Sequence, residues 1–554
     1  MALVDDWQLW HTPAGVPFAS IPVGDHWEHH PLLSRAARSA LARTAYEATG
    51  RPPRSAARAE ALDVLAGTAL FAGPTHDVHV RVAAHGSAVY LDLGDPDWRA
   101  VEVTADGWRV VSDPPVRFRR PRALAALPVP VAGTVDALRA VLPVASDDDW
   151  HVLVAWLLAS LRPRGPYPLL ALHGEAGSGK STAARVLRAV LDPSTVPLRS
   201  APHDDRDLVI AAQHSWVLAV DNVSTVPPWL SDALCRIATG GGYGARELYS
   251  DAEEVVLEAQ RPVLLTGIEE LATRGDLADR TLSVVLPPIA DAERRTEAEV
   301  WAAVDAMRPG VLGALLDGVA CGLRTEAAVQ LAHLPRMADA GRWVYAAAPA
   351  VGLDPAWVLA IWERQREEAA TTTLEASAVG AAVRTLMDDV PMWRGSMAAL
   401  LAALAAGQPE AVTRDRTRWP QSTQALSGAL RRLGSALRAV GIIVATGREA
   451  KASRARWVSL CREGRPPRPP RPDLSADGAD PGRPRTTLDD LTSSTSSTNE
   501  ARRPEVLDDL DDMDDVARGS THCRHCHEPT LNTGDAGPEC APGHGCAGDV
   551  EAPR

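Results

Sequence analysis

Lysine is almost absent from this sequence of 554 residues. Of its 57 basic residues, only Lys180 and Lys451 are lysines. We interpret the excess of arginine as a GC-rich coding bias, under which a lysine survives where arginine cannot replace it. Arginine is a poor replacement where a compact ammonium group must meet phosphate oxygens, because its guanidinium is a planar fork. Lys180 is therefore the first candidate for a functional residue.

Long hydrophobic runs are also lacking. The longest uncharged apolar stretch, Met397–Ala406, is far shorter than the roughly 20 residues that a membrane-spanning helix needs. The first ten residues contain Asp5 and Asp6, which argues against a secretory signal sequence. We therefore expect a soluble, cytoplasmic protein with no membrane partner.

Cysteine is sparse outside the last 32 residues, where four of the seven cysteines lie. An odd total with one tight cluster favours metal binding in a reducing compartment over a disulfide framework. The cluster has the spacing of a zinc ribbon, and Zn²⁺ would supply folding energy on the order of 10 kcal/mol to a segment too short for a core. The predicted zinc ligands are Cys523, Cys526, Cys540 and Cys546, with His544 as an alternative to Cys546.

The formal charge of −14 argues against a protein that is basic throughout, but the charge is unevenly distributed. Residues 414–456 contain nine arginines and one lysine against two acidic residues, a pattern typical of contacts to DNA phosphates. The alternative is a solvated basic face that docks on an acidic partner, and residues 505–515 hold seven acids in eleven positions. The predicted DNA contacts in this stretch are Arg431, Arg432, Arg438, Arg448, Lys451, Arg454 and Arg456.

A chain of this length exceeds one hydrophobic core, so several domains are expected. Apolar periodicity, turn residues and composition divide the chain into six segments. They are an α+β N-terminal domain (1–145), an α/β nucleotide-binding domain (146–290), a helical region (291–374), a winged helix-turn-helix (375–462), a disordered linker with an acidic stretch (463–520) and a zinc ribbon (521–548).

The winged helix-turn-helix is predicted from the order of its elements. A helix over 377–387 precedes a short strand around Trp393, and Ser396 begins a second helix. Ser422 or Thr423 begins a third helix, which is predicted to continue to Val440. Two strands follow, over 442–446 and 457–460. In the N-terminal domain, the pair Asp106-Gly107 predicts a hairpin turn between two strands.

A phosphate-binding loop is the most specific motif. The sequence fits G-x-x-x-x-G-K-[ST] without a mismatch, between an apolar strand and a helix. Glycines allow successive backbone N–H groups to converge on phosphates, where the helix N-terminus adds its positive end. The predicted ligands of ATP, or of another nucleoside triphosphate, are Gly174, Glu175, Ala176, Gly177, Ser178, Gly179, Lys180, Ser181 and Thr182.

Two further strands supply the polar groups that such a loop needs. The strand over 216–220 ends at Asp221, which is predicted to hold Mg²⁺ together with the hydroxyl of Ser181. The next apolar strand, after Pro262, ends at Thr266, a candidate sensor of the γ-phosphate. An aspartate that merely caps a turn is the alternative for Asp221.

Two arginines are candidates for contacts outside the phosphate loop. Arg246 lies at the tip of a glycine-rich hairpin and is predicted to touch DNA, with a plain surface loop as the alternative. Arg280 precedes another strand and is the better candidate for an arginine finger across a subunit boundary, with Arg274 second. A structural salt bridge is the alternative for both of these.

Four short sequence strings in the predicted nucleotide-binding domain together indicate a known family. They are Asp221-Asn222-Val223-Ser224, Ala238-Thr239-Gly240-Gly241-Gly242, Arg246-Glu247-Leu248-Tyr249 and Leu277-Ala278-Asp279-Arg280. With them, the chain resembles the ATP-binding proteins of phages and bacterial mobile elements, which are similar to the superfamily 3 helicase part of primase-helicases. The resemblance runs from about residue 77 to about residue 460. It implies an AAA+-like, hexamer-forming P-loop ATPase that moves on DNA, with Lys180 and Ser181 on the nucleotide.

Two positions depart from that family. Asn222 stands where such helicases place a second acidic residue, so hydrolysis is slow or uses another carboxylate such as Asp204, Asp205 or Asp207. Thr266 stands where asparagine is usual. We therefore expect a catalytic set of Lys180, Asp221, Asn222, Thr266 and Arg280, in a helicase-type DNA motor that serves replication of a mobile element. The alternative is an ATP-switched DNA-binding protein without unwinding activity, and a primase or polymerase is a possible partner in either case.

Overall fold

The computed structural model describes residues 4–246, 254–267, 275–448 and 456–462. All of them belong to one of the two units into which the chain divides, residues 1–470. The predicted linker and zinc ribbon lie outside the described residues, as do Lys451 and Arg454.

The N-terminal part begins with a three-stranded antiparallel sheet and two helices that the sequence patterns did not fully predict. α2 contacts β1 and β2, and Leu62 and Leu65 pack with Ile21 in a small core of their own. Neither this sheet nor α2 was predicted from the sequence. The elements are β1 (Gln8–His11), β2 (Pro17–Val23), β3 (His26–Pro31), α1 (Arg35–Thr49) and α2 (Ser55–Phe71).

A second antiparallel sheet has the strand order β5-β6-β7-β8. A hairpin joins β7 and β8 as predicted, but Thr104 pairs with Gly107, so the turn residues are Ala105 and Asp106 and not Asp106 and Gly107. Val103 shares the largest hydrophobic core with residues of the later domains, so that core crosses the boundary predicted at residue 145. The elements are β4 (Val78–His79), β5 (Val82–His85), β6 (Ala88–Asp92), β7 (Ala100–Thr104), β8 (Gly107–Val111) and β9 (Arg117–Phe118), of which β4 and β9 pair with each other.

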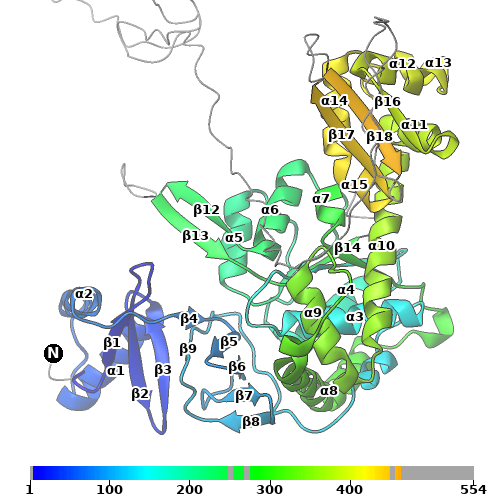
Figure 1. The fold of residues 1–554 in the computed structure, drawn as a ribbon. Helices are drawn as coiled ribbons and strands as arrows, with labels where there is room; N and C mark the ends of the chain where they lie inside the picture. Colours follow the sequence, from blue (N-terminus) through cyan, green and yellow to red (C-terminus); the bar gives the residue numbers. More distant parts are fainter. Residues whose placement is uncertain (1–3, 247–253, 268–274, 449–455, 463–554) are drawn as a thin grey trace, which may run out of the picture. The chain divides into compact units, whose positions relative to one another are not determined.

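The central domain is a four-stranded parallel sheet with the order β11-β14-β10-β15, flanked by helices (Figure 1). Strands β10, β11 and β14 are buried, as expected for a parallel sheet that is covered on both faces, whereas β15 at its edge is partly exposed. The elements are η1 (Val135–Ala140), α3 (Asp147–Ser160), β10 (Leu169–His173), α4 (Lys180–Leu191), α5 (Asp205–Gln213), β11 (Leu218–Val220), α6 (Pro228–Thr239), β14 (Val263–Gly267), α7 (Gly275–Ala278) and β15 (Thr281–Val285).

A separate hairpin of β12 (Gly241–Arg246) and β13 (Glu254–Ala259) lies beside α5 and α6 (Figure 1). This confirms the glycine-rich hairpin predicted around Arg246, which lies between β11 and β14 in the chain. In its register Arg246 is the partner of Glu254, so Arg246 ends the first strand.

The helical region contains α8 (Glu297–Thr325), α9 (Ala338–Ala347) and α10 (Pro355–Ala376), with the short 3₁₀ helices η2 (Asp291–Glu293), η3 (Glu326–Ala328) and η4 (Ala348–Val351). Within the described residues, the helical stretch 297–328 is long and apolar enough to cross a membrane by length and composition alone. Val311, Leu315 and Val319 of α8 are buried in the largest core, which is how the central helix of a globular domain packs.

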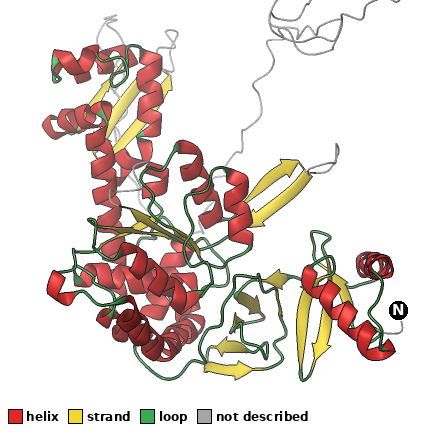
Figure 2. Cartoon of the chain, turned by 180° about the vertical axis from the view of Figure 1, so that it is seen from behind, coloured by secondary structure: helices red, strands yellow, loops and turns green. Residues whose placement is uncertain are grey.

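The C-terminal part has its own core, built from helices against a three-stranded antiparallel sheet of order β16-β18-β17 (Figure 2). Ser396 and Ser422 cap their helices, each through its hydroxyl. The single helix predicted to reach Val440 is wrong: α14 ends at Arg432, and α15 begins at Gly434, a weak helix former. The elements are α11 (Ala378–Asp389), β16 (Met392–Gly395), α12 (Met397–Ala406), α13 (Glu410–Arg414), α14 (Thr423–Arg432), α15 (Gly434–Ala439), β17 (Ile442–Arg448) and β18 (Arg456–Arg462).

Candidate nucleotide site and candidate DNA surface

The predicted phosphate loop joins the end of β10 to the start of α4. Gly174, Gly177 and Gly179 have φ angles of +154°, +83° and +77°, conformations that side chains with a Cβ rarely adopt. A Cβ on Gly174 would also lie 2.5 Å from the carbonyl oxygen of Leu286. The backbone therefore requires glycine at these positions, and the loop opens on the N-terminus of α4, where anions are favoured.

Lys180 is held at this loop by two backbone carbonyls. Its Nζ donates hydrogen bonds of 2.7 Å to the oxygens of Gly174 and Glu175. Both bonds are to neutral acceptors, so phosphate oxygens, which carry charge, make stronger partners for the ammonium group. Ser178 is fully buried under the loop, and its hydroxyl has no hydrogen-bond partner among the described residues.

Ser181, Asp221 and Thr266 meet at one point. Ser181 Oγ donates to Asp221 Oδ1 at 2.8 Å, and Thr266 Oγ1 donates to the same oxygen at 2.5 Å. Thr266 is buried, and its hydroxyl also accepts a 2.9 Å hydrogen bond from the backbone N–H of Asn222. The threonine hydroxyl is thus bonded to the aspartate, a contact that the sequence did not predict, and its role as a sensor of the γ-phosphate stays a prediction.

The register of the sheet explains why these residues meet. Val220 of β11 pairs with Leu265 of β14, and Thr266 pairs in turn with Leu172 of β10. The strands are parallel, so their carboxyl ends share one edge of the sheet, and the loop after β10 opens at that edge.

The oxygens at this edge suit Mg²⁺. This ion prefers oxygen ligands and takes one or two from the protein, with the rest from phosphate and water. The Asp221 carboxylate and the Ser181 hydroxyl offer oxygen atoms of this kind. The described part of the chain contains no group of three or more His, Cys, Asp or Glu side chains arranged for a metal.

Asn222 contacts the site through its backbone N–H. It has a positive φ of 54°, and its N–H is bound to Thr266. Two of the three carboxylates considered as replacements are engaged elsewhere: Asp204 caps α5, and Asp205 forms a 2.8 Å ion pair with Arg236.

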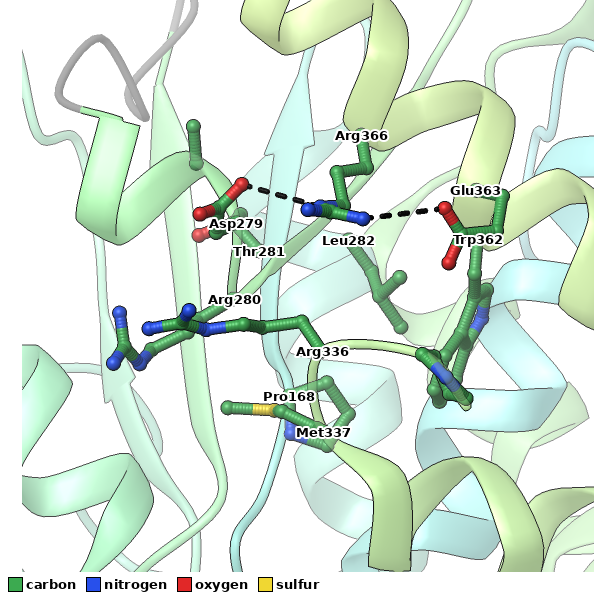
Figure 3. A pocket seen from close by; sticks show the side chains of 12 residues that line it. Pro168, Asp279, Arg280, Thr281, Leu282, Arg336, Met337, Trp362, Glu363 and Arg366 are labelled. Atoms are coloured by element: carbon green, nitrogen blue, oxygen red, sulfur yellow. Dashed lines mark hydrogen bonds and ion pairs between the residues drawn. The ribbon is translucent and has the colours of Figure 1, made fainter. Parts of the chain in front are cut away.

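Arg280 lies at the opposite edge of the sheet from the phosphate loop. Its carbonyl oxygen accepts a hydrogen bond from the N–H of Leu169, the first residue of β10. Arg280 and Arg336 line a pocket in which Arg366 forms ion pairs with Asp279 and Glu363 (Figure 3). Neither Arg280 nor Arg336 has a carboxylate partner among the described residues, and Arg280 Nη1 instead donates to the carbonyl of Asp276.

Three of the predicted DNA contacts share one groove in the C-terminal part. The groove has a volume of about 900 Å³ and lies between α14 and the β17–β18 pair. Arg432 and Arg438 are exposed but do not line it. The groove is lined among others by Arg431, Arg448, Arg456, Gln424, Ser427 and Trp457.

The groove also has polar residues that the charge pattern did not single out. Gln424, Ser427 and Arg431 are three and four residues apart, a spacing that places them on one face of α14. Arg394 of β16 lies over the ring of Trp457 at 4.3 Å from its centre. Helical spacing within α14 was the available signal for the first two.

The fold and this site define an α/β protein with a phosphate-loop motif at the carboxyl edge of a parallel sheet. Residues 135–357 match the family model of the actinomycete integrative conjugative element replication protein. Residues 379–471 match the model of the AICE RepA C-terminal domain, so the two matches span more than half of the chain. The chain belongs to this family of mobile-element replication proteins.

Solved structures give more distant similarities. The apo structure of the NrS-1 C terminal region is 12% identical, with a TM-score of 0.38, over 83% of this chain and 97% of that chain. An A form apo structure of the same region is 11% identical, with a TM-score of 0.35 over the same shares. A ligand complex of JCV helicase is 12% identical over 31% of this chain and 55% of that chain, with a TM-score of 0.21. No curated protein matches the chain in sequence.

Proposed function

We propose that this replication protein is an ATP-hydrolysing motor of helicase type that binds DNA and acts as a ring of identical subunits, such as a hexamer. The observation that carries the proposal is the meeting of Ser181, Asp221 and Thr266 at the mouth of the glycine loop. Lys180 would bind the β- and γ-phosphates in place of the loop carbonyls. Asp221, kept oriented by Thr266, would hold Mg²⁺ together with Ser181, and the bound ion would supply neutralisation of phosphate charge.

The position of Arg280 supports assembly into a ring. Strand β10 has five residues, so about 16 Å separates the edge with Arg280 from the edge with the phosphate loop. An arginine at that distance cannot reach its own subunit's γ-phosphate. It can serve the nucleotide of a neighbouring subunit, where an arginine finger stabilises charge in the transition state.

The C-terminal groove supports DNA binding through a winged helix. Arg448 and Arg456 lie on the two strands of the β-ribbon, and Arg431 lies at the end of α14. A helix beside a basic β-ribbon is suited to duplex DNA, with the helix in the major groove and the ribbon on phosphates. The β12–β13 hairpin, in which Arg246 ends β12, is proposed as a second contact to DNA.

The competing proposal is an ATP-switched DNA-binding protein without unwinding. Asn222 favours it, because an amide orients water but accepts no proton. Strand displacement of a forked duplex by the full-length protein, with phosphate release measured with and without single-stranded DNA, separates the two. The motor requires unwinding and DNA-stimulated turnover, both lost in Lys180→Ala. Arg43→Ala, at an exposed residue of α1 that pairs with Glu47 and belongs to neither candidate site, is the control and should keep both activities. Turnover that DNA does not stimulate, with ATP still changing DNA affinity, supports the switch.

Zinc binding by the four C-terminal cysteines is part of the proposal. The support is the Cys-x-x-Cys spacing and the two later cysteines. One equivalent of zinc per chain in the purified protein, lost in Cys523→Ser, is the expected result. An unchanged zinc content in that variant contradicts it. A primase or polymerase partner would be tested by co-purification with the replication proteins of the host cell.

A further inference from the structure

The segment 286–294, between β15 and α8, lies along the phosphate loop. Its first residue, Leu286, donates its N–H to the carbonyl of His173 at the end of β10. Ile289 Cδ1 is 3.1 Å from the position that a Cβ on Gly179 would take. Two glycines of the loop, Gly174 and Gly179, therefore face this segment at close range.

Arg294 ends this segment at the third glycine. Its Nη2 atom is 3.9 Å from the position that a Cβ on Gly177 would take. Gly177 is the middle glycine of the motif and is exposed, so a phosphate bound in the loop comes within reach of the guanidinium. No sequence motif singles out Arg294.

The present partner of Arg294 is weak. The guanidinium forms a 3.1 Å ion pair with Asp291, whose side chain is 92% exposed, while that of Arg294 is 62% exposed. Exposed ion pairs three residues apart contribute little to stability, because water and salt screen them. A triphosphate carries more charge than one carboxylate, and its oxygens match the two-pronged guanidinium.

We propose that Arg294 is a second cation for the nucleotide in its own subunit: it leaves Asp291 and binds the phosphates of ATP beside Lys180. This inference rests on the proposed function, since it assumes that the loop binds ATP. It adds a phosphate ligand from outside the glycine motif, contributed by the segment that leads into α8.

The start of α8 is tied to the same region. Glu297, the first residue of α8, forms a 2.7 Å ion pair with Arg185 of α4, and Thr296 caps α8 with Glu299. A movement of Arg294 toward phosphate therefore pulls on a segment that is anchored at both ends. Nucleotide binding in this way reaches α8, which contacts the β7 and β8 strands.

The test is titration of the full-length protein with Mg-ATP by calorimetry. Arg294→Ala is expected to raise the Kd about tenfold, the loss of one charge-assisted contact at an exposed site. Arg295→Ala is the matched control, because Arg295 is directed to the carbonyl of Ala140 and is expected to keep the parent Kd. Asp291→Ala, which removes the competing carboxylate, is expected to bind Mg-ATP at least as tightly as the parent.

Three results would overturn the inference. These are a parent-like Kd for Arg294→Ala, an equal loss in Arg295→Ala, or a loss in Asp291→Ala as large as in Arg294→Ala, since the last would indicate a collapsed segment. Melting temperatures without nucleotide identify a variant that has not folded, and Arg294→Lys then replaces it, with an intermediate Kd expected. If the parent protein itself fails to bind Mg-ATP, the proposed function fails instead.

Discussion

Loss of Asp192 should lower the free energy of unfolding strongly, because this residue joins the segment before β5 to the domain that contains the phosphate loop. Asp192 is 2% exposed, and its carboxylate accepts a 3.0 Å hydrogen bond from Nε of Arg81, which is itself fully buried. The other carboxylate oxygen accepts the backbone N–H groups of Trp216 and Val217, at 2.9 and 3.1 Å. Those two residues precede β11, the strand that Asp221 follows.

Asp192→Ala leaves a buried guanidinium without its counter-charge and two buried N–H groups without acceptors. Breaking a buried ion pair from one side costs about 3–5 kcal/mol, and each orphaned N–H adds about 1–3 kcal/mol in isolation. These contributions overlap, so we expect a loss of about 4 kcal/mol or more in the free energy of unfolding. Asp192→Asn keeps an acceptor oxygen and should lose about half as much.

Urea denaturation followed by tryptophan fluorescence measures this loss. Asp205→Ala is the control: its ion pair with Arg236 is partly exposed, so about 1 kcal/mol or less is expected. If Asp192→Ala lowers the free energy of unfolding no more than Asp205→Ala does, Asp192 does not hold this junction together. If Asp192→Ala cannot be purified folded, the comparison of Asp192→Asn with Asp205→Asn decides.

Three further predictions concern the phosphate-loop site, the C-terminal groove and the sheet of strands β1–β3. Thr266→Val removes the hydroxyl that orients Asp221 and should raise the magnesium concentration needed for half-maximal ATP turnover at least about tenfold, whereas Thr266→Ser should behave like the parent. Arg448→Ala with Arg456→Ala should reduce the salt slope of duplex binding by about 1.8, at about 0.9 per lost phosphate contact. Arg414→Ala, outside the groove and paired with Glu410, should leave the slope unchanged. Burial, followed by the positive charge of Arg117, lowers the pKa of His29 to about 3. Between about pH 6.5 and pH 3, the unfolded chain therefore binds a proton on His29 that the folded chain does not. Stability should therefore fall as the pH drops from about 6.5 toward 3, and His29→Gln should flatten that fall in urea denaturation.

The parts of the fold that local chemistry dictates could be predicted from the sequence. The glycine loop, the hairpin turn before Gly107 and the helix cap at Ser396 depend on a few neighbouring residues, and the structure contains all three. The break between α14 and α15 was missed, although Gly434 was the available signal. Strands β1–β3 were missed because Pro17 and Pro22 lie within β2 and Pro31 ends β3, and proline counts against a strand.

The contacts that connect distant parts of the chain could not be predicted. Arg81 and Asp192 are 111 residues apart, and neither stands in a motif. The position of Thr266 at the end of a strand was enough to predict that it lies at the site, but its bond to Asp221 depends on the register of two strands. Such pairings follow from tertiary packing, which a single sequence does not display.

ATP turnover should require more than one subunit, because each chain places Arg280 at the edge remote from its own phosphate loop. Turnover per chain is therefore expected to rise with protein concentration. Lys180→Ala, which keeps Arg280, and Arg280→Ala, which keeps the loop, should each be nearly inactive alone. Mixed, they should regain activity, since the nucleotide on one can meet the arginine of the other. A mixture of Arg280→Ala with the Lys180→Ala, Arg280→Ala double variant is the control and should stay inactive. If Arg280→Ala alone turns over ATP like the parent, Arg280 serves structure and the argument for a shared site is lost.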